Sequence, residues 1–138
     1  MPHFNVHMFE EALDGEVEPA TIRALTDALV EVYGERAREL AVVEVFGIPR
    51  HRWGIGGAPA TEHRPTVTLH MREPALHVID DAPRHLIASI TDAMAGVLGD
   101  DIRAHLAVTV VGIPTGRSGV AGEVVQPSLD PRSGDICQ

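Results

Sequence analysis

The chain has 138 residues, of which 44% are hydrophobic and 22% charged, and its formal net charge is −9 at pH 7. This composition is ordinary for a globular protein, and the length suffices for one core or for two fused units that share one. The negative charge disfavours nucleic acids and membrane surfaces as partners, and no apolar run reaches the roughly 18 residues of a membrane span. No signal segment precedes the first predicted strand, so we expect cytoplasmic residence. The single cysteine, Cys137, excludes an internal disulfide framework.

The first elements in chain order are a strand, a helix and a second strand. The first strand is predicted over residues 3–9, directly after Pro2. The helix is predicted over residues 18–34, because it has a proline in its first turn and a glycine at its end. Its inward stripe is expected to hold Ile22, Leu25, Ala28, Leu29 and Val32. A mostly apolar strand is then predicted over residues 40–46.

The same pattern then occurs a second time. Matches separated by 65 positions follow one another in order along the chain, among them Thr26-Asp27-Ala28 with Thr91-Asp92-Ala93 and Gly47-Ile48-Pro49 with Gly112-Ile113-Pro114. Upstream of these, the separation is 63 positions, as for Pro2 with Pro65 and Val6-His7-Met8 with Leu69-His70-Met71. An ordered series with one small slip indicates the tandem duplication of a unit of roughly 60 residues.

The second unit therefore predicts a strand over residues 66–72, a helix over about 83–98 and a strand over 105–111. The inward residues of this helix are expected to be Ile87, Ile90, Met94 and Val97. Because a helix that joins two strands forms a right-handed crossover and a parallel pair, the fold class is α/β. We expect tandem β-α-β units that form a four-stranded sheet with two helices on one face.

The domain organisation follows from the repeat. We expect a single domain over residues 1–125, made of the repeats 1–57 and 65–125 with a linker at 58–64, and a C-terminal tail at 126–138. Strands this apolar are typical of sheets covered on both faces, and two helices cover only one. The other face is therefore expected to be buried in an oligomer, with the hairpins after the second strands reaching onto a neighbour.

Pro2 is the first candidate for chemistry. Removal of Met1 would leave it with a secondary amine, whereas every internal proline nitrogen, including that of Pro65, is an amide without basicity. An amine of this kind can act as a general acid, a general base or a nucleophile. We expect one such site per chain.

The first unit resembles the tautomerase superfamily, to which 4-oxalocrotonate tautomerase belongs. The resemblance lies in Pro2, in the length of the β-α-β unit and in the stretch Ile48-Pro49-Arg50-His51-Arg52-Trp53-Gly54-Ile55-Gly56-Gly57. It covers residues 2–57 well and residues 65–125 more weakly. It implies the longer, fused architecture that assembles as a homotrimer, as in malonate semialdehyde decarboxylase and cis-3-chloroacrylic acid dehalogenase. It also implies Pro2 as the catalytic residue and Trp53 as a substrate contact or an apolar plug at a subunit interface.

The arginines of the resemblance are only partly matched. Ala12 and Val42 stand where the tautomerases carry substrate-binding arginines, so the simple pattern for binding a diacid is absent. Arg72, at the end of the third predicted strand, lies close to the position where the decarboxylase and the dehalogenase bind a carboxylate. It is expected to bind substrate, although a solvated strand-end arginine is the plain alternative.

Further candidates are weaker. Arg52 and Arg117, on the two hairpins, could reach the pocket of a neighbouring chain, but such residues more often form exposed ion pairs that contribute little to stability. Glu39 could act as an auxiliary acid, or be a surface glutamate. His7 and His70 occupy equivalent positions in both repeats, which favours a structural role.

Three functions remain possible, two of them enzymatic and one a non-catalytic role. The first is a tautomerase or isomerase that acts on a small 2-oxo or enol carboxylate. The second is a decarboxylase or hydratase of a small oxo or unsaturated acid, with a cationic Pro2. The third is a non-catalytic trimeric scaffold. We expect a small anionic carboxylate as the partner, no cofactor and no metal site, since the histidines show no metal-ligand spacing.

Overall fold

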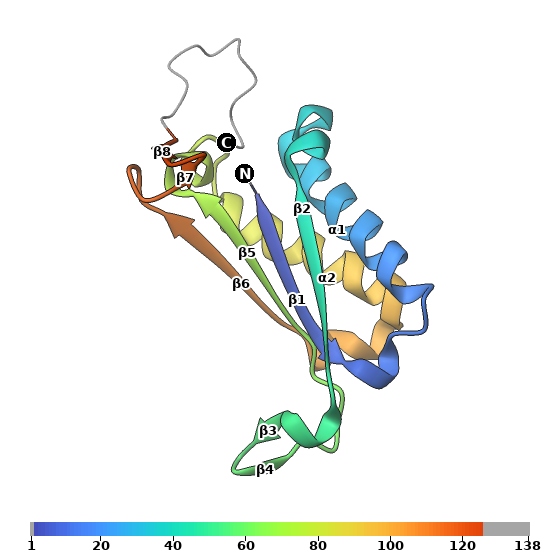
Figure 1. Cartoon of the computed structure of the whole chain (residues 1–138). Coiled ribbons are helices and arrows are strands. Elements are labelled where there is room, and N and C mark those ends of the chain that lie inside the picture. The colour runs from blue at the N-terminus through green and yellow to red at the C-terminus, as the bar shows by residue number, and fades with distance from the viewer. Residues whose placement is uncertain (1, 126–138) are drawn as a thin grey trace.

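The computed structural model describes residues 2–125, so Met1, the predicted tail at 126–138 and Cys137 lie outside the described residues. Two β-α-β units follow each other along the chain (Figure 1). Their elements are β1 (His3–Phe9), α1 (Val17–Tyr33) and β2 (Val42–Ile48), then β5 (Thr66–Arg72), α2 (Ala82–Leu98) and β6 (Ala107–Ile113). Each unit ends in a small hairpin, formed by β3 (Gly54–Ile55) with β4 (Ala58–Pro59) and by β7 (Gly119–Val120) with β8 (Glu123–Val124).

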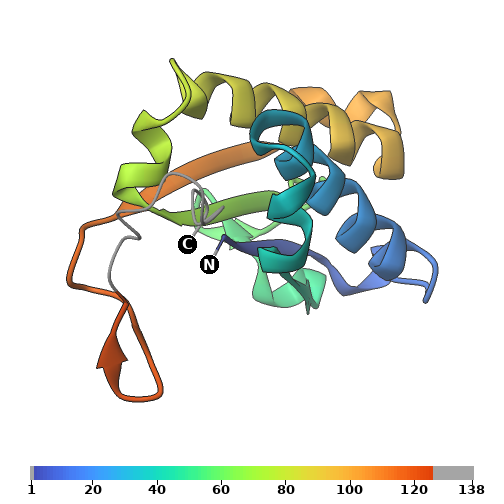
Figure 2. The same ribbon diagram turned by 90° about the horizontal axis from the view of Figure 1, so that it is seen from above.

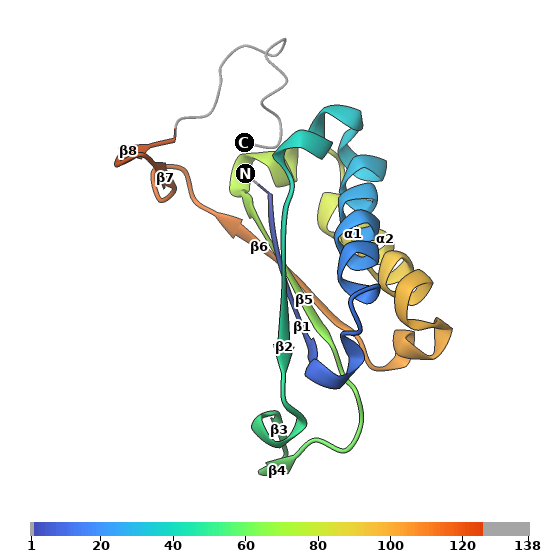
Figure 3. The same cartoon turned by 45° about the vertical axis from the view of Figure 1, so that its right-hand side comes forward.

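The four main strands form one mixed sheet, and the two helices cover one side of it. The strand order is β2-β1-β5-β6, with parallel pairs inside each unit and an antiparallel pair of β1 with β5 between the units. Both helices lie on the same face of the sheet, as the view from above and the turned view show (Figures 2 and 3). The predicted architecture is therefore confirmed. Among residues 2–125, no helix is long and apolar enough to cross a bilayer.

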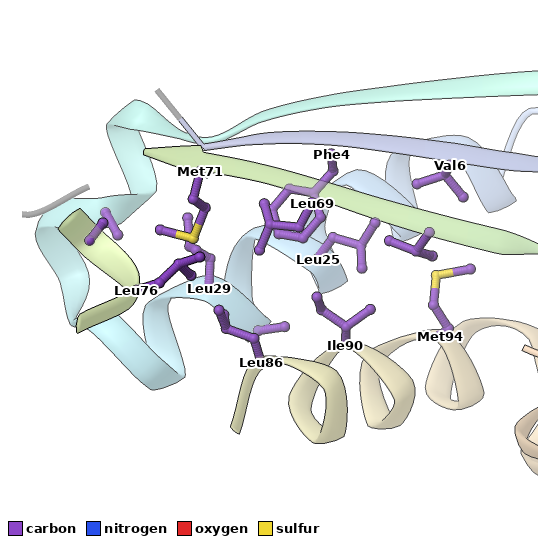
Figure 4. Packing of buried hydrophobic residues seen from close by; sticks show 14 of the residues in the cluster. Phe4, Val6, Leu25, Leu29, Leu69, Met71, Leu76, Leu86, Ile90 and Met94 are labelled. Carbon is purple, nitrogen blue, oxygen red and sulfur yellow. The ribbon is translucent and has the colours of Figure 1, made fainter. Parts of the chain in front are cut away.

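The core lies between the sheet and the two helices. Alternate residues of the middle strands, such as Phe4, Val6, Leu69 and Met71, are fully or almost fully buried and point toward the helices (Figure 4). They meet an apolar stripe on each helix, formed by Leu25, Ala28 and Leu29 on α1 and by Leu86, Ile90 and Met94 on α2. The period of two on the strands and the helical period on the helices place both apolar sets in one layer.

The predicted stripes were wrong at Ile22 and Ile87, and Val97 of α2 is only partly buried and is not packed against the core. Ile22 and Ile87, equivalent in the repeat, are 44% and 41% exposed. The residues directly before them, Thr21 and Leu86, are fully buried instead. Since Thr21 and Leu25 stand four positions apart, the polar threonine continues the buried row of α1 and the isoleucine falls outside it.

The second strand of each unit begins two residues later than predicted, at Val42 and Ala107. Short 3-10 helices, η2 (Glu35–Leu40) and η5 (Asp100–Ala104), occupy the residues between helix and strand. They follow Gly34 and Gly99, whose φ angles of 93° and 100° suit glycine and turn the chain out of each helix.

The repeated Gly-Ile-Pro has a packing reason. After β1 and β5 the chain turns through η1 (Glu10–Ala12) and η4 (Glu73–His77), which lie against the ends of β2 and β6. A Cβ at Gly47 would lie 2.7 Å from the Leu13 side chain, and one at Gly112 would overlap the Glu73 carboxylate. A side chain at Gly47 would also lie 3.3 Å from Glu10 Cα, so the backbone of η1 limits the space there, whereas at Gly112 the Glu73 side chain would have to move.

The sheet face that carries no helix, called the open face below, is more polar than predicted. Its side chains on the middle strands are His3, Asn5 and His7 of β1 and Thr66, Thr68 and His70 of β5, all partly exposed. Apolar residues lie on its edge strands, such as Phe46 on β2, which is 41% exposed. The prediction of strands that are apolar on both faces was wrong for β1 and β5, because their polar residues alternate with buried ones.

Candidate functional site

The two ends of the sheet are related by the internal repeat. In the antiparallel pair of β1 with β5, His3 is opposite His70 and His7 is opposite Thr66. One end of the sheet therefore carries Pro2 and the end of β5, and the other carries Pro65 and the end of β1. A seven-residue strand spans about 23 Å, so the two ends are well separated. In Figure 1 the start of β1 lies at the same end of the sheet as β7 and β8, and the β3–β4 hairpin lies at the opposite end.

A hollow of about 360 Å³ opens at the Pro2 end, on the open face. Its floor is formed by side chains of the two middle strands: His3, Asn5, His70 and Arg72. Its wall comes from β6 and the β7–β8 hairpin, through Ile113, Ser118, Gly119, Val120 and Val125. The hollow thus joins a basic and polar floor to a largely apolar wall, which suits an anion with a short apolar part.

Pro2 is buried at the start of β1, at the same end of the sheet, and is not itself one of the residues that line the hollow. Its carbonyl accepts a hydrogen bond of 2.9 Å from the Val42 N–H, which holds the start of β1 against β2. Continuing the β1–β5 register by one pair places Pro2 opposite Met71, and hence its nitrogen next to the position of Arg72. The strand register therefore brings Pro2 and Arg72 to the same end of the sheet.

Arg72 is only 3% exposed. Its Nη2 donates a hydrogen bond of 3.3 Å to the Val125 carbonyl, at the end of the second hairpin. The plain alternative of a solvated strand-end arginine was therefore wrong. This hydrogen bond joins the end of β5 to the residue that follows β8.

The Pro65 end is built differently although its backbone is equivalent. Phe9 holds the position that Arg72 holds in the repeat, and it is 1% exposed. Its ring stacks on His63 with a centroid distance of 4.9 Å and meets the edge of Trp53 at 5.4 Å. Arg50 lies over the same ring, with 4.9 Å from Cζ to the centroid. Aromatic packing fills the space that the hollow occupies at the other end.

His63 belongs to this packing as a neutral ring. Its Nε2 accepts a hydrogen bond of 3.1 Å from the Phe9 N–H, and an accepting nitrogen cannot carry a proton. Burial lowers the pKa of His63, the nearby Arg50 lowers it further, and Glu11 opposes them. Since Arg50 also donates to Glu11 at 2.7 Å and to the Thr61 carbonyl at 2.9 Å, the segment around β3 and β4 is fixed to the end of β1.

The structure brings together only some of the candidate site residues within one chain. Arg117 precedes Ser118, a lining residue of the hollow, and is exposed. Glu39 is exposed on η2, three positions before the first residue of β2, and so lies at the Pro2 end. Trp53 and Arg52 lie at the Pro65 end, about a strand length away. Within one chain they are not neighbours of Pro2.

Besides Arg72, the polar residues that line the hollow were not predicted as site residues: His3, Asn5, His70 and Ser118. The first three could have been placed on the open face from the sequence, because successive side chains of a strand point to opposite faces and these three alternate with the apolar residues of β1 and β5. Ser118 holds the position that Trp53 holds in the first repeat. Both residues accept the hydrogen bond that closes their hairpin: the Trp53 carbonyl accepts from the Ala60 N–H at 2.6 Å, and the Ser118 carbonyl accepts from the Val125 N–H at 2.8 Å. Among residues 2–125, no group of histidine, cysteine and acidic side chains could hold a metal ion.

Comparison with known proteins extends these observations. No protein-family model matches the sequence, and no curated protein matches it. Solved structures do match. A fused 4-OT that forms an asymmetric trimer is 22% identical, with a TM-score of 0.74, over 88% of this chain and 94% of that one. A protein inactivated by 2-oxo-3-pentynoate is 17% identical, with a TM-score of 0.74, over the same shares.

A third similar structure is N1, a member of the cis-3-chloroacrylic acid dehalogenase family. It is 20% identical, with a TM-score of 0.73, over 89% of this chain and 82% of that one. All three matches span both repeats, and their sequence identities are low enough that the likeness concerns the fold. The chain has the tautomerase-superfamily fold in its fused form, with two β-α-β units in one polypeptide.

Proposed function

We propose that the protein is a cofactor-free tautomerase or isomerase of a small 2-oxo or enol carboxylate, with the amine of Pro2 as the general acid and base. The observation that carries the proposal is the position of Pro2. It is buried at the end of the sheet, and the strand register places it beside Arg72, which lines the hollow. The likeness to fused 4-OT supports the same choice.

The chemistry follows from the amine. An N-terminal amine has an ordinary pKa of about 7.7–8.0. Burial and a nearby guanidinium both penalise its protonated form, so both would lower the pKa of Pro2 toward neutrality. A neutral amine could then take a proton from the carbon next to the 2-oxo group and return it elsewhere on the substrate. Arg72 would bind the carboxylate and hold that carbon near the amine.

Decarboxylation or hydration of a small oxo or unsaturated acid is the second candidate. The likeness to N1 of the dehalogenase family favours it, as does a single matched arginine. This chemistry would need Pro2 to be cationic at neutral pH, so a raised pKa of the amine would select it over tautomerisation. Loss of all chemistry in a trimeric scaffold is the remaining outcome.

Covalent labelling of Pro2 tests the proposal. 2-Oxo-3-pentynoate has a 2-oxo carboxylate, and its alkyne can be attacked by an amine. We expect one adduct per chain, mapped by mass spectrometry to the peptide that begins with Pro2, with loss of turnover of phenylenolpyruvate in the same proportion. A variant with an additional residue before Pro2 is the matched control, and its Pro2 should stay unlabelled because the nitrogen is then an amide. Absence of turnover, with labelling spread over other residues, would contradict the proposal.

We further propose a homotrimer, on the likeness to trimeric fused 4-OT and on the open sheet face. Such an assembly could bring the Trp53 end of one chain to the Pro2 end of another, as the sequence hypothesis for Trp53 and Arg52 requires. Light scattering should give a mass of three chains that is unchanged on dilution through the micromolar range. A stable monomer would overturn both the trimer and the shared pocket. Cytoplasmic residence stays a prediction.

A further inference from the structure

We propose that His70 binds the 2-oxo oxygen of the substrate and donates a hydrogen bond to the enolate that forms there. This inference rests on the proposed function and adds a specificity-determining residue to it. The sequence pattern had favoured a purely structural role for His70, because His7 stands at the equivalent position of the first repeat. The structure separates the two histidines.

The two imidazole rings have different surroundings. His7 is paired with Phe46 in the β1–β2 register, and the two rings stack with a centroid distance of 4.8 Å and an angle of 10°. The equivalent partner of His70 in the β5–β6 register is Val111, which has no ring. His70 instead lines the hollow together with Arg72. The repeat therefore provides an internal comparison in which one histidine is stacked and the other faces open space.

Of the two histidines in the hollow, His70 is the one available to a ligand. His3 is directly opposite His70, but its Nε2 lies 2.5 Å from the Glu44 carboxylate on β2. Among the described residues, no hydrogen bond or ion pair engages the His70 ring. A neutral imidazole has one N–H donor and one acceptor nitrogen, so it can bind either an oxo group or the oxyanion that replaces it.

The spacing of His70 and Arg72 suits adjacent oxygens on one small molecule. Residues two apart on a strand point to the same face, with Cα atoms about 6.6 Å apart. Both side chains are long enough to converge over that distance. A carboxylate held by Arg72 would thus place the neighbouring 2-oxo group toward His70, while Ile113, Val120 and Val125 offer an apolar wall to the rest of the molecule. The geometry points to short 2-oxo acids with an apolar tail.

The chemical step is balanced within these groups. When the Pro2 nitrogen takes a proton from C3, the electron pair of the C–H bond forms the C2–C3 double bond and the carbonyl oxygen becomes an enolate oxygen. The His70 N–H hydrogen bond to that oxygen strengthens as charge develops. The proton then passes from Pro2 to the enolate oxygen, which gives the neutral enol and restores the neutral amine; an enol substrate such as phenylenolpyruvate passes through the same steps in reverse. No oxidant, reductant or further reactant is needed.

Paired ligands and paired variants test this assignment. The wild-type protein should bind 2-oxobutanoate several-fold more tightly than butanoate, by up to about ten-fold, because only the former can accept from His70. The His70→Leu variant should lose this preference, and His70→Gln, which keeps a donor, should retain part of it. His7→Leu is the matched control and should keep the full preference. Isothermal titration gives all the dissociation constants.

Turnover of phenylenolpyruvate supplies the second readout. Removal of a donor to a developing oxyanion typically lowers kcat by about 10² to 10³-fold, so His70→Leu should reduce kcat more than it raises KM. If wild-type binding shows no preference for the oxo acid, or if His70→Leu keeps it, the assignment of His70 is overturned even where turnover persists. If the preference depends on His70 but the wild type shows no turnover, the proposed function fails and the ligand assignment stands.

Discussion

A chain that keeps Met1, or that carries one added residue before Pro2, should lose turnover completely while its fold and assembly stay unchanged. The addition converts the amine of Pro2 into an amide, which has neither a titratable proton nor basicity. It leaves the backbone contact of Pro2 intact, because that contact uses the carbonyl, which accepts from Val42. Circular dichroism, light scattering and a phenylenolpyruvate assay on the intact and the extended protein check the expectation.

A graded variant separates basicity from position. Pro2→Ala keeps a terminal amine, although a primary and less rigid one, so a large but incomplete loss of kcat is expected. Mass spectrometry must first show that Met1 is absent from each active sample. Full activity in a chain whose N-terminus is demonstrably blocked would eliminate Pro2 as the acid and base. If neither the blocked nor the unblocked chain had any activity, the scaffold hypothesis would gain support.

Arg72→Ala should lower kcat/KM for an anionic substrate by about one to two decades. The change removes a charge-assisted hydrogen bond to the carboxylate, which is typically worth about 1.5–3 kcal/mol. Arg72→Lys should restore only part of the loss, because an ammonium group cannot reproduce the two-point contact of a planar guanidinium. Initial-rate kinetics with an uncharged ester of the same substrate should show a much smaller difference between variant and wild type.

The burial of Arg72 adds a stability effect to this expectation. Since its guanidinium is 3% exposed and bonds the Val125 carbonyl, Arg72→Ala should also lower the melting temperature by a measurable amount. Arg103→Ala is the matched control, because Arg103 forms exposed ion pairs with Asp92 and Asp100 far from the hollow, and exposed pairs contribute little. A loss of stability with unchanged kinetics would mean that Arg72 only anchors the hairpin.

Much of the fold could be predicted because each strand and helix is indicated by the sequence pattern of both repeats. Strands 3–9 and 66–72 have the predicted bounds, and the glycines that end both helices stand where the pattern placed them. The later strands start two residues late because short 3-10 helices leave no periodic signature. The recurring Asp27 and Asp92 were seen only as signs of duplication. They bind Arg38 and Arg103, which join each helix to the 3-10 turn after it, at 2.8 and 2.6 Å.

The site was harder to predict, because residues of the same unit can lie at opposite ends of the sheet. The Arg52-Trp53 stretch belongs to the unit that begins with Pro2, yet a whole strand separates them within the chain. His70 was set aside because its repeat partner is also a histidine. Only the register shows that Phe46 covers one ring and Val111 leaves the other open.

The aromatic packing at the Pro65 end shows that the two ends of the sheet can evolve separately. In an assembly of identical single units, each substitution is repeated at every equivalent end, so an end that must stay reactive constrains all the others. Fusion of two units in one chain removes that constraint. Phe9 and Arg72 occupy equivalent positions of the repeat, yet Phe9 packs against Trp53 and His63 and Arg72 lines a hollow. A protein engineer could therefore redesign the Phe9 end as a second, independent binding site while the Pro2 end keeps its own sequence.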